Sequence, residues 1–426
     1  MWLLILFSFV ICLFTCVTNK QIKYHPVILF NGVWLVIFIL YKIDYLNFTI
    51  LTDHSIAILL IMIFFFPLGV LLGLKNRYRV KRHGRLSYVM STYEFREKLF
   101  WALCILASIV MLIDELTIII RLIQGASFYD IMRDASGKGT VEISGSLQVL
   151  LYLFVVYPVS YLVSPICAVK FINGSQNKYR YLAINLIIVA LSVAHHGGRK
   201  MLFLFGISYI LAYLIYGKKA QTSRKTKWFV VIILVLLVVI MNEISVSRGI
   251  DDVGTSFYAY LTCSPSLMQT YLSSSIVSSQ RLFGFFSFNG FVYPIMILPN
   301  YLGIKSPAIY QTTQTVRFFI ENSYVPIGGY SHNMNAFLPV GAYFYVDGGF
   351  AFEIIGMVLY GMLAGYLYKK VLKNRDEYNC SLYIFVCIGL ILSFARFYFT
   401  SYAYAFAFLY VCFLFKKRDN LVDNKR

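Results

Sequence analysis

Long runs of apolar residues alternate with short polar gaps along most of this chain. Runs of roughly 17 to 25 apolar residues are long enough to cross the hydrocarbon core of a bilayer as a helix. The pattern predicts about eleven transmembrane helices, at residues 2–18, 26–41, 55–74, 99–120, 147–169, 181–195, 200–216, 228–243, 349–368, 381–395 and 399–415. We therefore expect an all-α, polytopic integral membrane protein.

Composition supports this fold class and excludes a soluble domain. The 426 residues are 59% hydrophobic and only 13% charged, and the mean hydropathy is +0.71. The apolar surface that these runs carry needs lipid or neighbouring helices around it, because water would not solvate it. The protein is expected in a membrane.

Basic residues are distributed unevenly among the gaps, and this bias predicts the orientation. The gaps after predicted spans 1, 3, 5, 7, 9 and 11 contain 27 of the 38 Lys and Arg residues. By the positive-inside rule these gaps face the cytoplasm, so the N-terminus is outside and the C-terminus is cytoplasmic. The net charge of +19 is spread over six short loops rather than gathered on one soluble face, which argues against nucleic-acid binding.

Three regions follow from the spans. Residues 1–243 form an N-terminal bundle of eight transmembrane helices, residues 244–348 form a long extracytoplasmic loop, and residues 349–426 form three further helices and a basic cytoplasmic tail. The loop is aromatic and low in charge, unlike a disordered segment. Its apolar stretch 282–303 is interrupted by Gly and Pro, so we expect a re-entrant or interfacial element there rather than another crossing.

Polar groups on the predicted outer face are the candidates for chemistry. A basic residue on the outer face goes against the positive-inside rule, so its presence there needs an explanation. The ordinary explanation is that it binds lipid phosphates. That ordinary reason suffices for Lys200, Arg281 and Lys305. The candidates on this face are His195, His196, Arg199, Lys200, Arg248, Asp251, Asp252, Arg281, Arg317, Glu321, His332, Asp347 and Arg396.

The turn between predicted spans 6 and 7 has the features of an anion site. Gly197 and Gly198 let the backbone bend sharply and approach a ligand closely, and Arg199 follows them at the start of a helix. A helix N-terminus adds free N–H donors and the positive end of the helix dipole. The competing interpretation is a hairpin that uses glycine only to turn.

Several short motifs resemble those of the Wzy-type O-antigen and capsule repeat-unit polymerases. They are the Gly197-Gly198-Arg199 turn opening a helix, the long outer loop, His332-Asn333, and Tyr345-Val346-Asp347-Gly348-Gly349 leading into a Gly-rich late span. The resemblance covers nearly the whole chain in layout. The family pattern often has a small residue after the arginine of the turn, whereas here Lys200 follows Arg199.

The resemblance implies a GT-C-like glycosyltransferase of the bacterial cytoplasmic (inner) membrane. Such an enzyme transfers a growing glycan from undecaprenyl diphosphate onto the next lipid-linked repeat unit. Its partners would be undecaprenyl-diphosphate-linked oligosaccharides and membrane lipids, with a chain-length regulator and a flippase of the same pathway. The resemblance also implies outer-loop arginines that bind diphosphate, with Arg199 first and Arg248 and Arg317 after it.

The chemistry of glycosyl transfer asks for cations and a proton acceptor. The diphosphate leaving group gains negative charge that a metal or fixed cations must stabilise. The outer face has no Asp-x-Asp cluster, so we expect arginine-based catalysis without metal or cofactor. The predicted diphosphate-binding residues are Arg199, Arg248, Arg317 and Arg396, supported by Gly197 and Gly198, and the predicted catalytic residues are His332, Asp347 and Asp252.

Simpler interpretations compete with each of these assignments. His332 is also compatible with an ordinary turn histidine, Asp347 before two glycines with a turn, and Asp251-Asp252 beside Arg248 with a solvated ion pair. The aromatic residues after Arg396, at positions 398–404, are compatible with a glycan groove or with packing.

Two other functions share much of this pattern. A lipid-linked glycan ligase would use the same diphosphate chemistry with a different acceptor. A multi-pass transporter or flippase of lipid-linked oligosaccharide would more often contain internal repeats, and no repeat is evident between residues 1–216 and 228–415.

Overall fold

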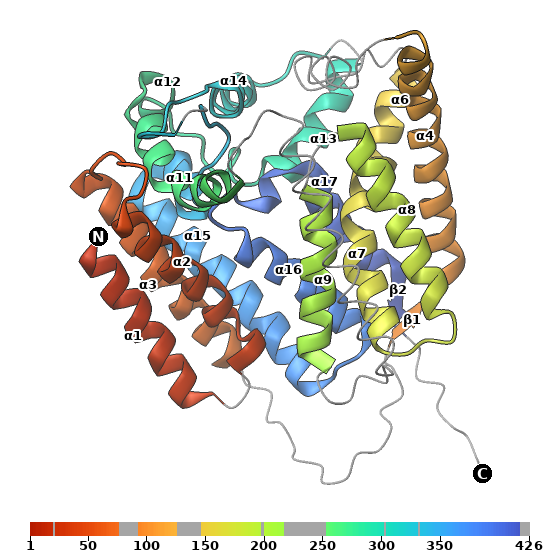
Figure 1. The fold of residues 1–426 in the computed structure, drawn as a ribbon, viewed down its shortest axis with the longest axis horizontal. Helices are drawn as coiled ribbons and strands as arrows, with labels where there is room; N and C mark the ends of the chain where they lie inside the picture. The colour runs from red at the N-terminus through yellow and green to blue at the C-terminus, as the bar shows by residue number, and fades with distance from the viewer. Residues whose placement is uncertain are drawn as a thin grey trace. The chain divides into compact units, whose positions relative to one another are not determined.

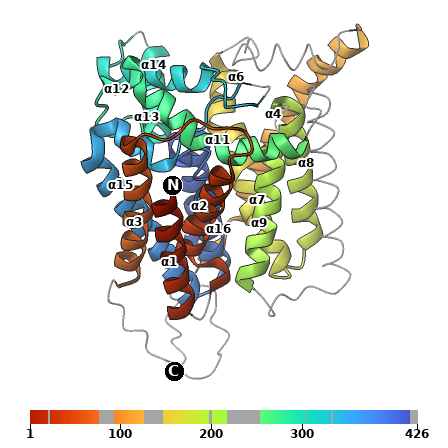
Figure 2. The ribbon, with the colours of Figure 1, turned by 60° about the vertical axis from the view of Figure 1, so that its left-hand side comes forward.

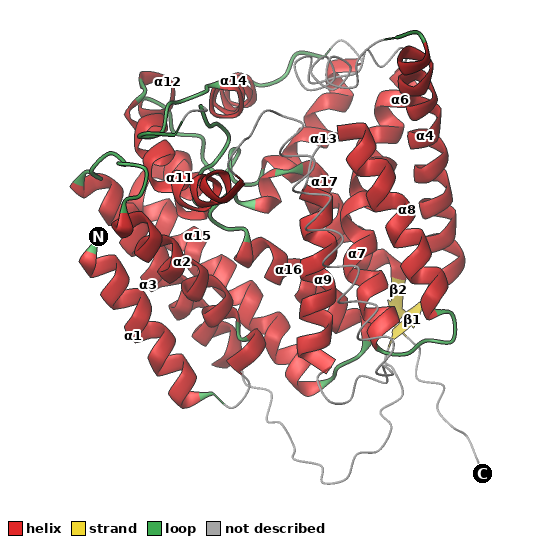
Figure 3. Cartoon of the chain, in the orientation of Figure 1, coloured by secondary structure: helices red, strands yellow, loops and turns green. Residues whose placement is uncertain are grey.

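A computed structural model describes residues 1–19, 22–75, 93–125, 146–196, 200–216, 253–301, 304–330 and 333–417. Within these ranges the chain is almost entirely helical (Figure 3). Among the described residues, five helical segments are long and apolar enough to cross a membrane, at Pro26–Ile43, Asp53–Lys75, Glu97–Leu116, Gln148–Ile172 and Val340–Lys373. The protein is therefore a helical membrane protein with several spans.

Each predicted span that the structure describes overlaps a helix, although α16 ends at Ile391, before the end of span 381–395, and α17 begins at Tyr402, after the start of span 399–415. The matching helices are α1 (Trp2–Thr18), α2 (Pro26–Ile43), α3 (Asp53–Lys75), α4 (Glu97–Ile123), α6 (Ser146–Leu151) continuing through η2 (Tyr152–Val156) into α7 (Tyr157–Ile172), α8 (Lys178–His196), α9 (Lys200–Tyr216), α15 (Val340–Lys373), α16 (Glu377–Ile391) and α17 (Tyr402–Leu414). The predicted span 228–243 lies outside the described residues.

The chain divides into two compact units. The first comprises Met1–Asn76, Val238–Lys369 and Val386–Ala405, and the second comprises Arg77–Leu237, Lys370–Phe385 and Phe406–Arg426. In the first unit α1, α2 and α3 lie side by side, and α2 and α3 also contact α11 (Val253–Ser273) (Figures 1 and 2). Three more helices of this unit are α12 (Ser275–Ser278), α13 (Asn289–Tyr301) and α14 (Ala308–Asn322). Short 3-10 turns lie at η1 (Ile22–Tyr24) and η4 (Tyr398–Thr400).

In the second unit α7 occupies the centre. Nearly all of its residues are buried, because α4, α8 and α9 pack around it (Figure 1). The same unit contains a feature that the all-α prediction did not include, a pair of short antiparallel strands. β1 (Tyr93–Phe95) pairs with β2 (Phe415–Lys417), with Glu94 opposite Lys416.

Glycines bring α3 and α15 into close backbone contact in the first unit. A methyl group added at Gly361 would lie 2.2 Å from the carbonyl oxygen of Phe66, and one added at Gly69 would lie 2.2 Å from that of Val358. Gly69 and Gly73 on α3, and Gly361 and Gly365 on α15, repeat every four residues. Small residues at this spacing let membrane helices approach closely, so van der Waals contact is made along both backbones.

The helix α15 is broken at Gly348 and Gly349. Gly349 has φ 71°, a left-handed conformation that glycine adopts without strain, and the break separates a short helix from a long one. The long part begins where the predicted span 349–368 begins. Gly356 approaches the ring of Phe344 and Gly341 approaches the side chain of Glu353, so the short helix folds back against the start of the long one.

The apolar stretch 282–303 does not form one continuous helix. Residues before Asn289 form turns, and α13 has 13 residues with Pro294 and Pro299 inside it. At 1.5 Å per residue α13 is about 20 Å long, shorter than the ~30 Å hydrocarbon core. A helix of this length does not span that core by itself, and the re-entrant or interfacial element stays a prediction.

Candidate functional site

Asp347 joins the break in α15 to the turn before α13. Its side chain is 1% exposed. One carboxylate oxygen accepts a hydrogen bond from the backbone N–H of Phe286 at 3.0 Å, and the other accepts one from that of Ser287 at 2.9 Å. The carbonyl oxygen of Asp347 also accepts from the N–H of Phe283 at 2.9 Å. Both carboxylate oxygens are thus already engaged in holding the 283–287 turn, which is a positioning role.

The non-helical residues 335–339, just before α15, connect the end of α14 to the turn after α16 through hydrogen bonds. The side-chain amide of Asn335 donates to the carbonyl oxygen of Glu321, and the N–H of Ala336 donates to that of Ile320 at 3.1 Å. Two residues later the N–H of Leu338 donates to the carbonyl oxygen of Ala395 at 3.1 Å. This ladder brings Arg396 toward Glu321, although 75 residues separate them in the chain.

Glu321 interacts with two of the predicted diphosphate-binding arginines, through an ion pair with Arg317 and electrostatically with Arg396. The guanidinium of Arg317 donates to the Glu321 carboxylate at 3.2 Å, one helical turn away on α14. Arg396 interacts electrostatically with the same carboxylate and with the phenol groups of Tyr343 and Tyr398. We call Arg317, Glu321 and Arg396 the arginine cluster. Within the described residues Arg396 makes no side-chain hydrogen bond, so its donors face no fixed acceptor there.

The electrostatics of this cluster favour an anion. Burial lowers the pKa of the Arg396 guanidinium, but Tyr343, Glu321 and Tyr398 raise it, and the net shift is upward, so Arg396 stays charged. Two guanidinium groups and one carboxylate leave a net charge of +1. The Arg317 side chain is 20% exposed and that of Glu321 is 42% exposed, so the pair is accessible from solvent. Planar guanidinium donors match the oxygens of phosphate and diphosphate groups.

The structure describes only part of the predicted site. Arg317, Arg396 and Asp347 lie in the first unit, and the arginine cluster brings the two arginines together. Gly197, Gly198, Arg199, Arg248, Asp251, Asp252 and His332 lie outside the described residues. Among the residues that are described, no three or more His, Cys, Asp or Glu side chains are grouped so that they could hold a metal ion.

The aromatic residues that follow Arg396 are packing residues. Tyr398, Phe399 and Tyr404 are 4%, 6% and 1% exposed, and the Phe399 and Tyr404 rings lie 5.1 Å apart. Thr400, between them, donates to the carbonyl oxygen of Phe286 and so helps to seat the turn that Asp347 holds. Tyr398, Phe399 and Tyr404 therefore offer no ring face to a sugar, because these three rings are covered, whereas Tyr402 is half-buried.

Glu353 was missed by the sequence analysis. Its side chain is fully buried, and neither carboxylate oxygen has a hydrogen-bond partner within the described part of the chain. A methyl group at Gly341 would lie 2.8 Å from Glu353 Oε1. The sequence does contain an indication of this residue, because Glu353 is the single charged residue in the apolar run 349–368. A charged residue inside a span usually marks a functional position.

The second unit contains a separate group of polar residues on α4, α6, η2 and α8. Asp114 accepts hydrogen bonds from Gln148, at 2.8 Å, and from the hydroxyl of Tyr152. Glu115 lies 4.0 Å from His195, and the ring of His195 stacks on Tyr152 with centroids 5.1 Å apart. Glu115 is buried and Asp114 is half-buried, and of these residues only His195 directly precedes the Gly197-Gly198-Arg199 turn in sequence.

Comparison with known proteins adds no assignment to this geometry. No protein-family model matches the chain, and it matches neither a curated protein nor a solved structure.

Proposed function

We propose that this protein is an oligosaccharide repeat-unit polymerase, a membrane glycosyltransferase acting on undecaprenyl-diphosphate-linked glycans at the outer face of the bacterial cytoplasmic membrane. The single observation that carries the proposal is the arginine cluster, in which Glu321 is ion-paired with Arg317 and interacts electrostatically with Arg396. The motifs around Arg199, His332 and Asp347 and the eleven-span, GT-C-like layout expected from the sequence agree with it.

The reaction moves one glycosyl bond. A hydroxyl oxygen of the acceptor glycan attacks the anomeric carbon of the donor, the bond from that carbon to the diphosphate oxygen breaks, and the undecaprenyl diphosphate leaves with the bonding electrons. The acceptor proton passes to a base, for which His332 and Asp252 remain the candidates. Asp347 is assigned a positioning role, because both of its oxygens are bonded to backbone N–H groups.

The arginine cluster would act on the leaving group. Negative charge grows on the diphosphate as the bond breaks, and preorganised cations stabilise that charge most strongly where water is excluded. Glu321 neutralises part of the cluster before the substrate arrives and holds Arg317 in place. A diphosphate bound to both guanidinium groups would replace the Glu321 carboxylate as the acceptor of Arg317 and would provide an acceptor for Arg396. Arg199 and Arg248 would serve as further cations.

The test compares Arg-to-Lys variants in a strain that lacks the native gene. Arg317→Lys and Arg396→Lys keep the charge but lose the planar pair of donors. Each is expected to lower the polymerisation rate roughly a hundredfold, equivalent to about 3 kcal/mol, while the protein is inserted at normal abundance. The matched control is Arg281→Lys, because Arg281 is exposed and donates only to the neighbouring carbonyl oxygen of Gln280.

The glycan product separates this function from its alternatives. Single-repeat glycans in the deletion strain and in the Lys variants indicate a polymerase, loss of all attached glycan indicates a ligase, and cytoplasmic accumulation of lipid-linked units indicates a flippase. Normal polymer from both Arg317→Lys and Arg396→Lys would refute the diphosphate-binding role of the arginine cluster.

A further inference from the structure

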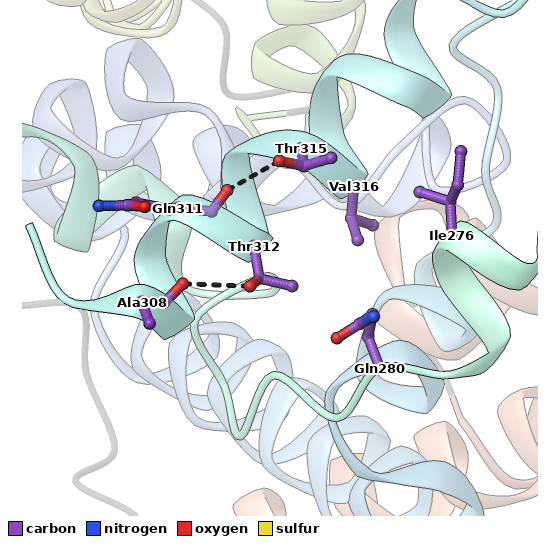
Figure 4. Close-up of a pocket in the computed structure, with 7 residues that line it drawn as sticks. All are labelled: Ile276, Gln280, Ala308, Gln311, Thr312, Thr315 and Val316. Atoms are coloured by element: carbon purple, nitrogen blue, oxygen red, sulfur yellow. Dashed lines mark hydrogen bonds between the residues drawn. The ribbon is translucent and has the colours of Figure 1, made fainter.

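A groove of about 430 Å³ lies between α14 and the segment that contains α12. Its walls are formed by Ile276, Gln280, Ala308, Gln311, Thr312, Thr315 and Val316, as Figure 4 shows. The α14 residues recur at spacings of three and four, so they form one stripe along the helix. The volume is within the range of small-molecule sites in proteins.

The polar atoms in the groove are neutral and rich in acceptors. The hydroxyl of Thr312 donates to the carbonyl oxygen of Ala308 at 3.1 Å, and that of Thr315 donates to the carbonyl oxygen of Gln311 at 3.1 Å. Each hydroxyl proton is thus engaged within the helix, while the oxygen lone pairs remain as acceptors. The amide nitrogen of Gln311 donates to Ser306 and that of Gln280 to Ser279, which leaves both amide oxygens to accept.

The apolar atoms of the groove complete its chemical character. Ile276, Ala308 and Val316 and the methyl groups of the two threonines lie among the acceptors, and none of the lining side chains is charged. A sugar ring has the complementary pattern, hydroxyl donors around its edge and C–H groups on its faces. A phosphate would find no cation in the lining, so it is a poor occupant.

The helix α14 contributes to the groove and also carries two residues of the arginine cluster, Arg317 and Glu321. Val316 lines the groove, and the next residue, Arg317, bonds to Glu321. A ligand with a neutral glycan joined to a diphosphate could therefore place its two parts on neighbouring faces of α14. The rings of Tyr398, Phe399 and Tyr404 are covered, so these three offer no competing surface on which a sugar could stack.

We infer that the groove between α12 and α14 binds uncharged sugar residues of the glycan whose diphosphate the arginine cluster holds. This inference rests on the proposed function, because that function supplies the glycan. The groove sets the position of the sugars and takes no part in bond breaking.

The test measures binding of sugar and diphosphate separately on the full-length protein in nanodiscs. The sugar probe is the carrier-free oligosaccharide released from the lipid-linked repeat by mild acid, followed by saturation-transfer NMR. Inorganic diphosphate is the second probe. The variant Thr312→Val/Thr315→Val removes both acceptor oxygens but keeps the branched shape of the side chains.

We expect the double variant to bind the oligosaccharide about tenfold more weakly, since two hydrogen-bond acceptors are lost. It should bind diphosphate normally, and its KM for the lipid-linked substrate should rise while kcat is retained. Gln280 lies on the other wall of the groove and outside a helix. The variant Gln280→Leu should also weaken oligosaccharide binding, and it shows whether the loss in the double variant could come from misfolding of α14. The control Thr270→Val removes an exposed hydroxyl that also bonds within its own helix, and should change neither probe.

The inference is overturned if the wild-type protein does not bind the oligosaccharide, or if both groove variants bind it as tightly as the wild type does. Such a result leaves the proposed function standing when Arg317→Lys still abolishes polymer. Conversely, groove-dependent sugar binding together with normal polymer from Arg317→Lys supports the groove and refutes the diphosphate-binding role of the cluster.

Discussion

The most direct test of the site scaffold is Asp347→Asn. The native carboxylate uses one oxygen for the N–H of Phe286 and the other for the N–H of Ser287, at 3.0 and 2.9 Å. Asparagine has the same shape but only one acceptor oxygen, so its NH₂ group must face one of the two N–H donors. The substitution removes one buried hydrogen bond and places two donors against each other.

The expected loss of local stability follows from this geometry. Asp347 is 1% exposed, so water cannot replace the lost acceptor. Leaving a buried donor unsatisfied costs about 1 to 3 kcal/mol, and a bond to a charged acceptor is at the upper end of that range. We expect the 283–287 turn to lose about 2 to 3 kcal/mol of local stability, which corresponds to opening roughly 30- to 150-fold more often.

Hydrogen–deuterium exchange, followed by mass spectrometry, measures how often this turn opens. Peptides that contain Phe286 and Ser287 should exchange roughly 30- to 150-fold faster in Asp347→Asn than in the wild type, whereas peptides of α2 should change little. The matched control is Asp44→Asn, because Asp44 Oδ1 alone accepts from the N–H of Phe48 and an asparagine oxygen can replace it. Exchange around Phe48 should therefore change little.

The outcome also decides between two roles for Asp347. Faster exchange together with reduced polymer indicates that Asp347 positions the turn. If exchange at Phe286 and Ser287 is unchanged while polymer is lost, the positioning argument is wrong and the predicted catalytic role of Asp347 is restored.

Four further predictions address packing, the buried acid, topology and metal. Gly361→Ala should lower stability by about 1 to 3 kcal/mol, since its new methyl would lie 2.2 Å from the Phe66 carbonyl oxygen, whereas Gly32→Ala, whose nearest neighbour is at 4.0 Å, should be neutral or stabilising in thermal unfolding. Glu353→Met should raise the unfolding midpoint, because no described residue bonds the buried carboxylate; a lower midpoint would reveal a partner. In a cysteine-free background, an impermeant thiol reagent should label Ser323→Cys but not Lys373→Cys in intact spheroplasts, and labelling at 373 would reverse the predicted orientation. Polymerisation should persist in excess EDTA, and its loss with rescue by a divalent ion would refute an arginine-based mechanism.

The positions of the helices could be predicted from the sequence alone. Burial in lipid depends on the apolar character of consecutive residues, which is a local property, so the run 26–41 predicts α2 at Pro26–Ile43 closely. The same holds for the break in α15, where two adjacent glycines at 348–349 precede a long apolar run. The choice of Arg317 and Arg396 as candidates also came from sequence, because a cation on the outer face opposes the charge bias.

Only the tertiary structure decided which of these residues meet. The bonds of Asn335, Ala336 and Leu338 connect the end of α14 to the turn before Arg396, and no local pattern encodes such pairing between distant segments. The structure likewise showed that Asp347 bonds to the backbone of a turn about 60 residues earlier in the chain. Hydropathy describes the apolar character of consecutive residues in the sequence. Which residues contact each other depends on how the helices pack, and packing is a property of the whole chain.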